Sequence, residues 1–233
     1  MAAAAVVVGV GPGLGWSLAK RFVEGGLHVV ACSRNPGKLA SRAAAEGLDV
    51  SFEACDATMP ADVARVFSKV AREHGAPAIV AFNAGAYERG GILDIRPEDF
   101  ERCWRVGCFA GFLVGQAAAR LMVPAGAGTI LFTGATASLR GGAGFANLAS
   151  PKFALRAVAQ SMARELGPKG VHVAHVIVDG QIESEARAGL LAERGPSSLL
   201  PADAIAESYW QLHRQPRGAW THELDLRPWV EKF

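Results

Sequence analysis

A run of alternating glycines lies between a short apolar segment and an amphipathic one. Residues 3–8 are small or β-branched, as in a buried parallel strand. The glycines follow directly, as Gly9, Gly11, Gly13 and Gly15. Leu14, Leu18 and Phe22 then recur at helical spacing, until Gly25 and Gly26 end the helix. A strand that passes through glycines into a helix leaves free N–H groups at the positive helix end, which can bind a pyrophosphate.

Strands and helices alternate along the rest of the chain. Apolar and β-branched runs predict six more strands, at residues 27–33, 50–55, 78–82, 129–133, 171–178 and 218–226. Helical spacing predicts helices at residues 36–46, 60–74, 97–123 and 151–166. Strands separated by such helices form a parallel sheet covered on both faces. The sequence therefore predicts one domain over residues 1–233, a three-layer, doubly wound α/β fold of the Rossmann type with about seven strands.

Composition and charge exclude several classes of protein. Of the 233 residues, 50% are hydrophobic and 20% charged, and the net charge of +2 is too small to indicate a nucleic-acid or membrane-surface partner. No apolar stretch approaches the roughly 20 residues of a membrane span. The four cysteines and six histidines show no metal-ligand spacing, so we expect free thiols, no metal and a reducing, cytoplasmic location. Cys32 and Cys55 end neighbouring predicted strands, which leaves a redox role open.

The end of the second predicted strand indicates which dinucleotide the fold prefers. Ser33 and Arg34 stand about twenty residues after the glycine run, where such a fold meets the adenosine ribose. An acidic residue there would bind the 2′-hydroxyl of NAD, whereas Arg34 suits the 2′-phosphate of NADP. Pro12 occupies the glycine run where a second basic residue would have strengthened this preference. We therefore expect NADP, with NAD as the alternative.

Several further segments resemble the short-chain dehydrogenases/reductases, and the resemblance covers nearly the whole chain. The glycine run is similar to the family's phosphate-binding loop, and the stretch from Ser138 to Val176 is similar to its active-site helix and following strand. The resemblance implies cofactor contacts from the four glycines and from Leu14, Ser33, Arg34, Asp56, Ala57, Asn83, Ala84, Gly85, Lys152, Gly180 and Ile182. It also implies a homodimer or homotetramer formed through the helices at residues 97–123 and 151–166, both of which carry apolar residues on more than one face.

The catalytic positions depart from the family's pattern. The family uses a tyrosine as proton donor, a serine that binds the carbonyl oxygen, a lysine and an asparagine. Lys152 matches the lysine, but Leu148 stands at the tyrosine position, Ala135 at the serine position and Gly107 at the asparagine position. Leu148 cannot transfer a proton and Ala135 cannot donate to an alkoxide, and each such group contributes about 10²-fold or more to the rate. The role left to Lys152 would be to bind the nicotinamide ribose.

Two other residues could replace the lost acid. Tyr87 follows the Asn83-Ala84-Gly85 turn and could serve as the acid, or could pack against the substrate cleft. Asp179 stands where the family has proline, beside the expected nicotinamide, and could act as an acid or cap a turn. Pro151 is a further departure, because Ser150-Pro151 is typical of a helix start and predicts a late or distorted helix before Lys152.

Two functions fit this combination. The first is an NADP-dependent oxidoreductase with a non-standard proton donor, a bound water, or a substrate that needs no protein acid, such as an activated alkene. The alternative is a catalytically inactive NADP-binding protein that acts as a sensor or scaffold. Residues 184–203 form a small substrate segment whose leucines suggest a small apolar ligand, although they could equally face the core. Because the cofactor contacts are retained, we favour the enzyme.

Overall fold

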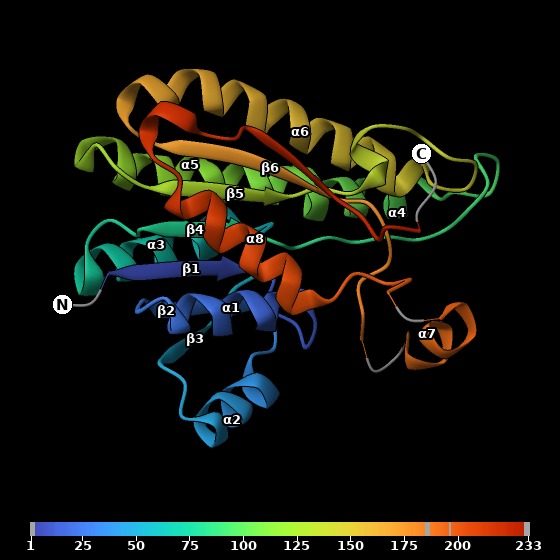
Figure 1. The fold of residues 1–233 in the computed structure, drawn as a ribbon. Coiled ribbons are helices and arrows are strands. Elements are labelled where there is room, and N and C mark those ends of the chain that lie inside the picture. Colours follow the sequence, from blue (N-terminus) through green and yellow to red (C-terminus); the bar gives the residue numbers. More distant parts are fainter. Residues whose placement is uncertain (1–2, 185–186, 196, 231–233) are drawn as a thin grey trace.

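Seven parallel strands form one sheet in the order β3-β2-β1-β4-β5-β6-β7 (Figure 1). The computed structural model describes residues 3–184, 187–195 and 197–230. The strands are β1 Ala4–Val8, β2 His28–Ser33, β3 Val50–Ala54, β4 Ile79–Phe82, β5 Thr129–Thr133, β6 His172–Val178 and β7 Glu223–Leu226. The strand order reverses between β1 and β4, which is where a doubly wound sheet binds its ligand. The predicted fold class is confirmed.

Helices cover both faces of this sheet, as Figure 1 shows. They are α1 Leu14–Glu24, α2 Gly37–Glu46, α3 Pro60–His74, α4 Pro97–Trp104, α5 Ala110–Ala125, α6 Ala146–Leu166, α7 Ala188–Arg194 and α8 Ala202–Arg214. One face packs against α3, α5 and α6, and the other against α1 and α8. Val6 and Val8 point to the first face and Ala5 and Val7 to the second, so β1 is buried on both sides and its sequence has no polar alternation.

A single helical segment runs through α4 and α5. Between α4 and α5 the π-helix η1, Arg105–Phe109, widens one turn. The combined helix Pro97–Ala125 has 29 residues, and an 18-residue window within it has a mean hydropathy of 1.6, so by length and composition alone it could cross a membrane. A core helix that packs against a sheet can have the same composition. The α5 part contributes Val114, Ala118 and Met122 to the core beneath the sheet, so its apolar residues serve packing.

Three element boundaries differ from the sequence prediction. Helix α6 begins at Ala146, so Pro151 lies inside the helix instead of starting it. The seventh strand is shorter than predicted, because residues 217–219 form a 3₁₀ turn before β7 begins at Glu223. Helix α8 was not predicted, and it buries Tyr209 and Trp210 against the sheet and α1. In each case contacts with distant segments outweigh the local signal.

The segment at residues 184–203 is partly outside the described residues, since 185, 186 and 196 are not described. Its described part contains α7 and a short bridge between Ile182 and Leu200. Leu199 and Leu200 are buried, and Leu200 belongs to the core cluster under α1 and α8. Leu200 therefore serves the core, whereas Leu199 also lines a small cavity beside α7.

Candidate active site

A cleft of about 620 Å³ opens at the carboxyl ends of β1, β2, β3 and β4. Its wall comes from the ends of these strands, from the glycine run and from α4 and η1. The lining residues are Val8, Gly9, Val10, Gly11, Cys32, Ser33, Arg34, Cys55, Asp56, Ala57, Thr58, Asn83, Ala84, Gly85, Glu98, Glu101, Arg102, Arg105, Val106 and Ala110. Most of the residues predicted to hold a dinucleotide are therefore brought together in one wall.

The glycines of the run have two different roles. Gly9 has a φ of +91°, and a Cβ there would lie 2.5 Å from the backbone nitrogen of Ala84. At Gly15 a Cβ would lie 2.7 Å from the carbonyl oxygen of Gly9. At Gly11 and Gly13 a Cβ would meet nothing within 4 Å. Gly9 lets the turn close onto the end of β4, and Gly15 lets α1 pack against the turn itself. Gly11 and Gly13 leave space in front of a helix whose first turn has no acidic residue and no side-chain cap.

The end of β2 contributes a free hydroxyl and a cation to the cleft. The Oγ of Ser33 is buried and has no hydrogen-bond partner among the described residues, and Arg34 next to it is exposed. A buried hydroxyl without a partner is costly unless a ligand supplies one. Together the hydroxyl and the guanidinium fit a phosphate at this point, in agreement with the sequence prediction.

The ends of β3 and β4 hold polar groups in fixed positions. Asp56 accepts hydrogen bonds from the backbone N–H of Thr58 at 2.9 Å and from its hydroxyl at 2.7 Å. These bonds lower the pKa of Asp56 and keep it ionised. Asn83 donates from its side-chain amide to the carbonyl oxygen of Gly9 at 3.1 Å, so it braces the glycine run from the neighbouring strand.

Lys152 lies deeper, on α6, and its side chain is buried. Its Nζ donates to the carbonyl oxygen of Thr133 at 2.6 Å. A Cβ on Gly85 would lie 4.0 Å from the same nitrogen, so the amine sits beside the turn that lines the cleft. Burial lowers the pKa of Lys152 to about 8. An ammonium with one protein acceptor at the cleft has N–H groups left for a ligand.

Leu148 and Ala135, which the sequence analysis assigns to the positions of the family's tyrosine and serine, both carry apolar side chains. Leu148 is half-buried on the first turn of α6. Ala135 precedes the short 3₁₀ helix η2, Thr136–Ser138, and donates its backbone N–H to the Oγ of Ser138 at 3.1 Å. Ser138 is buried, with its Oγ 3.4 Å from the Nε2 of His175. Its hydroxyl is therefore part of the support beneath this loop.

Gly107, which the sequence analysis assigns to the family's asparagine position, lies against Pro151. A Cβ on Gly107 would lie 2.8 Å from the Cβ of Pro151 and 3.3 Å from its Cγ. Pro151 cannot donate to the carbonyl of Asn147 one turn earlier, yet α6 continues and Lys152 stays buried. The sequence prediction that Pro151 marks the helix start is wrong. Because Gly107 on η1 has no side chain, the Pro151 ring has room in the middle of α6.

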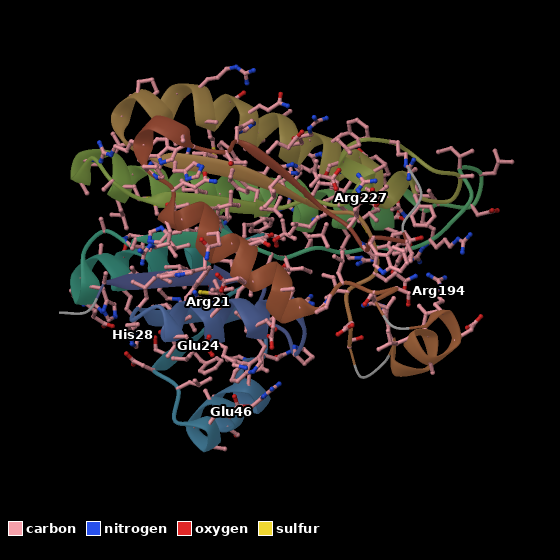
Figure 2. All side chains as sticks on the ribbon, in the orientation of Figure 1. Arg21, Glu24, His28, Glu46, Arg194 and Arg227 are labelled. Atoms are coloured by element: carbon pink, nitrogen blue, oxygen red, sulfur yellow. The ribbon has the colours of Figure 1, made fainter. Side chains whose placement is uncertain are left out.

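Asp179 is engaged by two partners. Its carboxylate accepts a hydrogen bond from the hydroxyl of Thr136 and lies 3.2 Å from a guanidinium nitrogen of Arg227. Figure 2 shows Arg227 at the end of the sheet where β6 and β7 finish, far from Arg21 and His28. Gly180 and Ile182 follow Asp179 and do not contribute to the wall of the large cleft; a Cβ on Gly180 would meet Pro228 at 2.8 Å. The loop after β6 is thus tied to η2 and to the chain after β7.

Tyr87 lies on the loop after β4, with its ring stacked on Phe145. The ring centroids are 5.3 Å apart with an interplanar angle of 6°, and Tyr87 is 41% exposed. Phe145 is the residue just before α6 and lies three positions before Leu148. Of the two predicted substitute acids, Tyr87 therefore has the solvent-facing position and Asp179 the engaged one.

Some residues of the site belong to no sequence motif that the sequence analysis used. Thr136, Arg227 and Phe145 act through partners far away in the chain, and only the fold reveals those pairs. Arg105 lines the cleft from η1, where the π-helical turn changes its direction. Thr58 was detectable, because an aspartate followed two residues later by threonine is a local capping pattern.

Comparison with known proteins agrees with this geometry. The short chain dehydrogenase family profile matches residues 3–194. The chain is 32% identical over 217 residues to "(21S)-21-acetoxyl-apo-melianone synthase SDR" of Melia azedarach, with 88% of this chain and 80% of that protein covered. A crystal structure of a short-chain dehydrogenase from Rhodopseudomonas palustris is 42% identical, with a TM-score of 0.85 and coverage of 97% and 99%.

A metagenomic short-chain oxidoreductase whose structure contains NADP is 25% identical to this chain, with a TM-score of 0.83 and 98% of each chain covered. Its likeness extends over the sheet and the helices on both faces. The glycine run, the cleft at the reversal of strand order and the buried lysine on α6 are all present here. By sequence and by structure, the chain belongs to the short-chain dehydrogenase/reductase family.

Proposed function

We propose that this protein is an NADP-dependent oxidoreductase that acts on a small apolar carbonyl compound or activated alkene. The observation that carries the proposal is the cleft of about 620 Å³ with the buried amine of Lys152 beside it. Together the cleft and the amine correspond to the cofactor-binding part of the family's site. The NADP in the related metagenomic oxidoreductase supports the choice of cofactor.

The residues of the cleft suit the parts of NADP in order along the sheet. The N-terminus of α1 would bind the pyrophosphate, and Ser33 with Arg34 would bind the 2′-phosphate. Asp56 would bind the adenine edge and Lys152 the nicotinamide ribose. When bound, the nicotinamide supplies the hydride, and the protein orients it toward the loops after β5 and β6.

The proton must come from a group other than residue 148. Tyr87 has a solvent-facing ring, and its hydroxyl has no hydrogen-bond partner among the described residues. Asp179 is less accessible to a substrate, because its carboxylate already accepts a hydrogen bond from Thr136 and pairs with Arg227. Two alternatives to a protein acid remain: a water molecule that donates the proton, or a hydride acceptor that needs no acid.

A screen of carbonyl and alkene acceptors for NADPH oxidation tests the proposal. Tyr87→Phe removes one candidate acid and Asp179→Asn the other, and each should leave the Kd for NADPH unchanged in a calorimetric titration. If Tyr87 or Asp179 is the acid, the matching variant loses at least about 10²-fold in kcat. Absence of NADPH binding to the wild type would contradict the proposal.

A second function is favoured by one observation. Pro151 fills the space that the family's asparagine would need, and this excludes the usual proton path through that side chain. An NADP-binding protein that serves as a sensor or scaffold would tolerate this loss. It would bind NADPH and leave every acceptor in the screen unreduced.

We also propose a homodimer or homotetramer through α5 and α6. Phe112 on α5 and Phe153 on α6 are large apolar side chains with 39% and 42% of their surface exposed. Exposed aromatic side chains on neighbouring helices are typical of a buried contact between copies. A monomer in light scattering at micromolar concentration would contradict this assembly.

A further inference from the structure

The substrate side of the site lacks groups that stabilise negative charge on a carbonyl oxygen. Ala135 and Leu148 offer only methyl groups at the two positions where the family places hydroxyls. The hydroxyl of Thr136 donates to Asp179, and that of Ser138 lies beneath the loop, near His175. A simple ketone would develop an alkoxide here with no donor from these residues, so it would be a poor hydride acceptor.

The same side presents a flat aromatic surface. Tyr87 stacks on Phe145 with nearly parallel rings, and the guanidinium of Arg89 lies 5.6 Å from the centroid of Phe145. Phe145 is thus held in contact with both Tyr87 and Arg89. Since Tyr87 is 41% exposed, part of its ring remains available to a ligand.

This aromatic pair is fixed in position by bonds between the two loops that carry it. The backbone N–H of Gly90 donates to the carbonyl oxygen of Gly144 at 3.3 Å. The side-chain amide of Asn147 donates to the carbonyl oxygen of Glu88 at 3.2 Å. One of these loops begins at Gly85, beside the Lys152 amine, and the other ends at the first turn of α6, which carries Leu148.

We propose that the hydride acceptor is a flat conjugated carbonyl compound, a quinone or a cyclic enone, which packs against Tyr87. The proposal rests on the oxidoreductase function proposed above and names its substrate class. Such acceptors share one chemistry: the electrons that arrive with the hydride are delocalised, so no protein acid or oxyanion donor is required. An apolar wall with an aromatic face then selects the substrate by shape and reactivity.

The reaction balances without a protein acid. The acceptor gains a hydride from the nicotinamide, the π electrons of its conjugated system move onto oxygen, and a hydroquinone or enolate anion forms. Water supplies the one proton that completes the product, and the nicotinamide is left oxidised. A hydroquinone is a phenol, and the phenol of tyrosine has a pKa of about 10. The hydroquinone anion is therefore a far weaker base than an alkoxide.

The test compares three acceptors in NADPH oxidation: menadione as the quinone, cyclohexenone as the enone, and cyclohexanone as the ketone without conjugation. We expect kcat/KM for menadione or cyclohexenone to exceed that for cyclohexanone by about 10²-fold or more, the contribution of the missing acid. A higher kcat/KM for menadione would identify a quinone as the preferred acceptor, and a higher kcat/KM for cyclohexenone would identify an enone.

Variants on the loop after β4 test the role of the aromatic face. Tyr87→Ala should weaken menadione binding to the NADP⁺ complex about tenfold in calorimetry and raise its KM similarly, whereas Tyr87→Phe keeps the ring and both values. Ile92→Ala is the matched control, since it removes a 79% exposed apolar side chain from the same loop. An unchanged Kd for NADPH shows that each variant is folded.

Each outcome has a separate meaning. Equal turnover of cyclohexanone and the conjugated acceptors would overturn the substrate class. Menadione binding that is indifferent to Tyr87→Ala would overturn the stacking role, and a large kcat loss in Tyr87→Phe would make Tyr87 an acid instead. NADPH binding with no oxidation by any acceptor would instead contradict the oxidoreductase function itself.

Discussion

The two sides of the carboxyl edge of the sheet differ in what their side chains offer a ligand. Around β1 to β4, the cofactor side holds polar groups in fixed positions: Ser33 presents a hydroxyl without a partner among the described residues, and Asp56 is held ionised by Thr58. Around β5 and α6, Ala135 and Leu148 present apolar groups, and these are the positions to which the sequence analysis assigns the family's hydroxyls. Residues suited to a dinucleotide can therefore stand beside an edge lined by apolar side chains.

The substrate side is nevertheless well packed. The ring of Pro151 occupies the space in front of Gly107, and Asp179 is bonded to Thr136 and Arg227. The close packing of Pro151 against Gly107 indicates that these two residues are matched to each other. The predictions below test how the cofactor side and the substrate side differ.

Restoring two hydroxyls on the substrate side should give the largest effect. Leu148→Tyr together with Ala135→Ser supplies an acid and an oxyanion donor, so cyclohexanone reduction should rise by about 10²-fold or more in kcat. Either change alone should do less, because both groups act on the same oxygen. The Kd for NADPH is the control and should stay constant. Fast ketone reduction by the wild type would show that these positions are wrongly assigned.

The cofactor side was largely predictable from the sequence, since its residues follow strand ends at regular intervals. Gly9 and Asn83 come directly after a strand, Ser33 is the last residue of β2, and Asp56 stands two residues after β3. The substrate side was predictable only as a set of missing groups. That Pro151 fits inside α6 depends on Gly107 in a different element, and no local pattern contains this information.

The contact between Gly107 and Pro151 should give the next largest effect. Gly107→Ala places a Cβ 2.8 Å from that of Pro151, so the free energy of unfolding should fall by about 1–3 kcal/mol. In a Pro151→Gly background the same change should be neutral or raise it by about 0.5–1 kcal/mol, because alanine is the better helix former. Urea titrations of the four proteins give the coupling energy. Additive effects would show that the two residues do not share one space.

On the cofactor side, Arg34→Ala should weaken NADPH binding by about tenfold, the usual strength of one charge-assisted hydrogen bond. The Kd for NADH should remain unchanged, because NADH lacks the 2′-phosphate. Arg72→Ala removes the same charge from an exposed position on α3 and serves as the control. Calorimetric titration with both nucleotides measures the selectivity, and equal losses for NADPH and NADH would place the 2′-phosphate elsewhere.

The smallest expected effect concerns the support beneath the substrate side. His175 is fully buried, and its Nδ1 lies 3.4 Å from Glu223, yet burial outweighs this partner and lowers the pKa of His175 to about 4. Unfolded histidine has a pKa of about 6.5. The unfolded chain therefore takes up a proton below that pH while the folded chain does not, and stability is lost as pH falls from about 6.5 toward 4.

Between pH 7.5 and 5.5 this histidine alone should reduce the free energy of unfolding by about 1 kcal/mol, with further loss from His172 and His213, whose pKa values are also lowered by burial. Urea titrations across this range measure the loss, and imidazole NMR signals should show His175 neutral down to about pH 4. Because His175 touches Gly134 and Ser138, its protonation would also disturb the loop that carries Ala135. Stability that is constant over this range would mean that water reaches these side chains. The substrate side would then be looser than the cofactor side, contrary to the dense packing seen at Gly107 and Pro151.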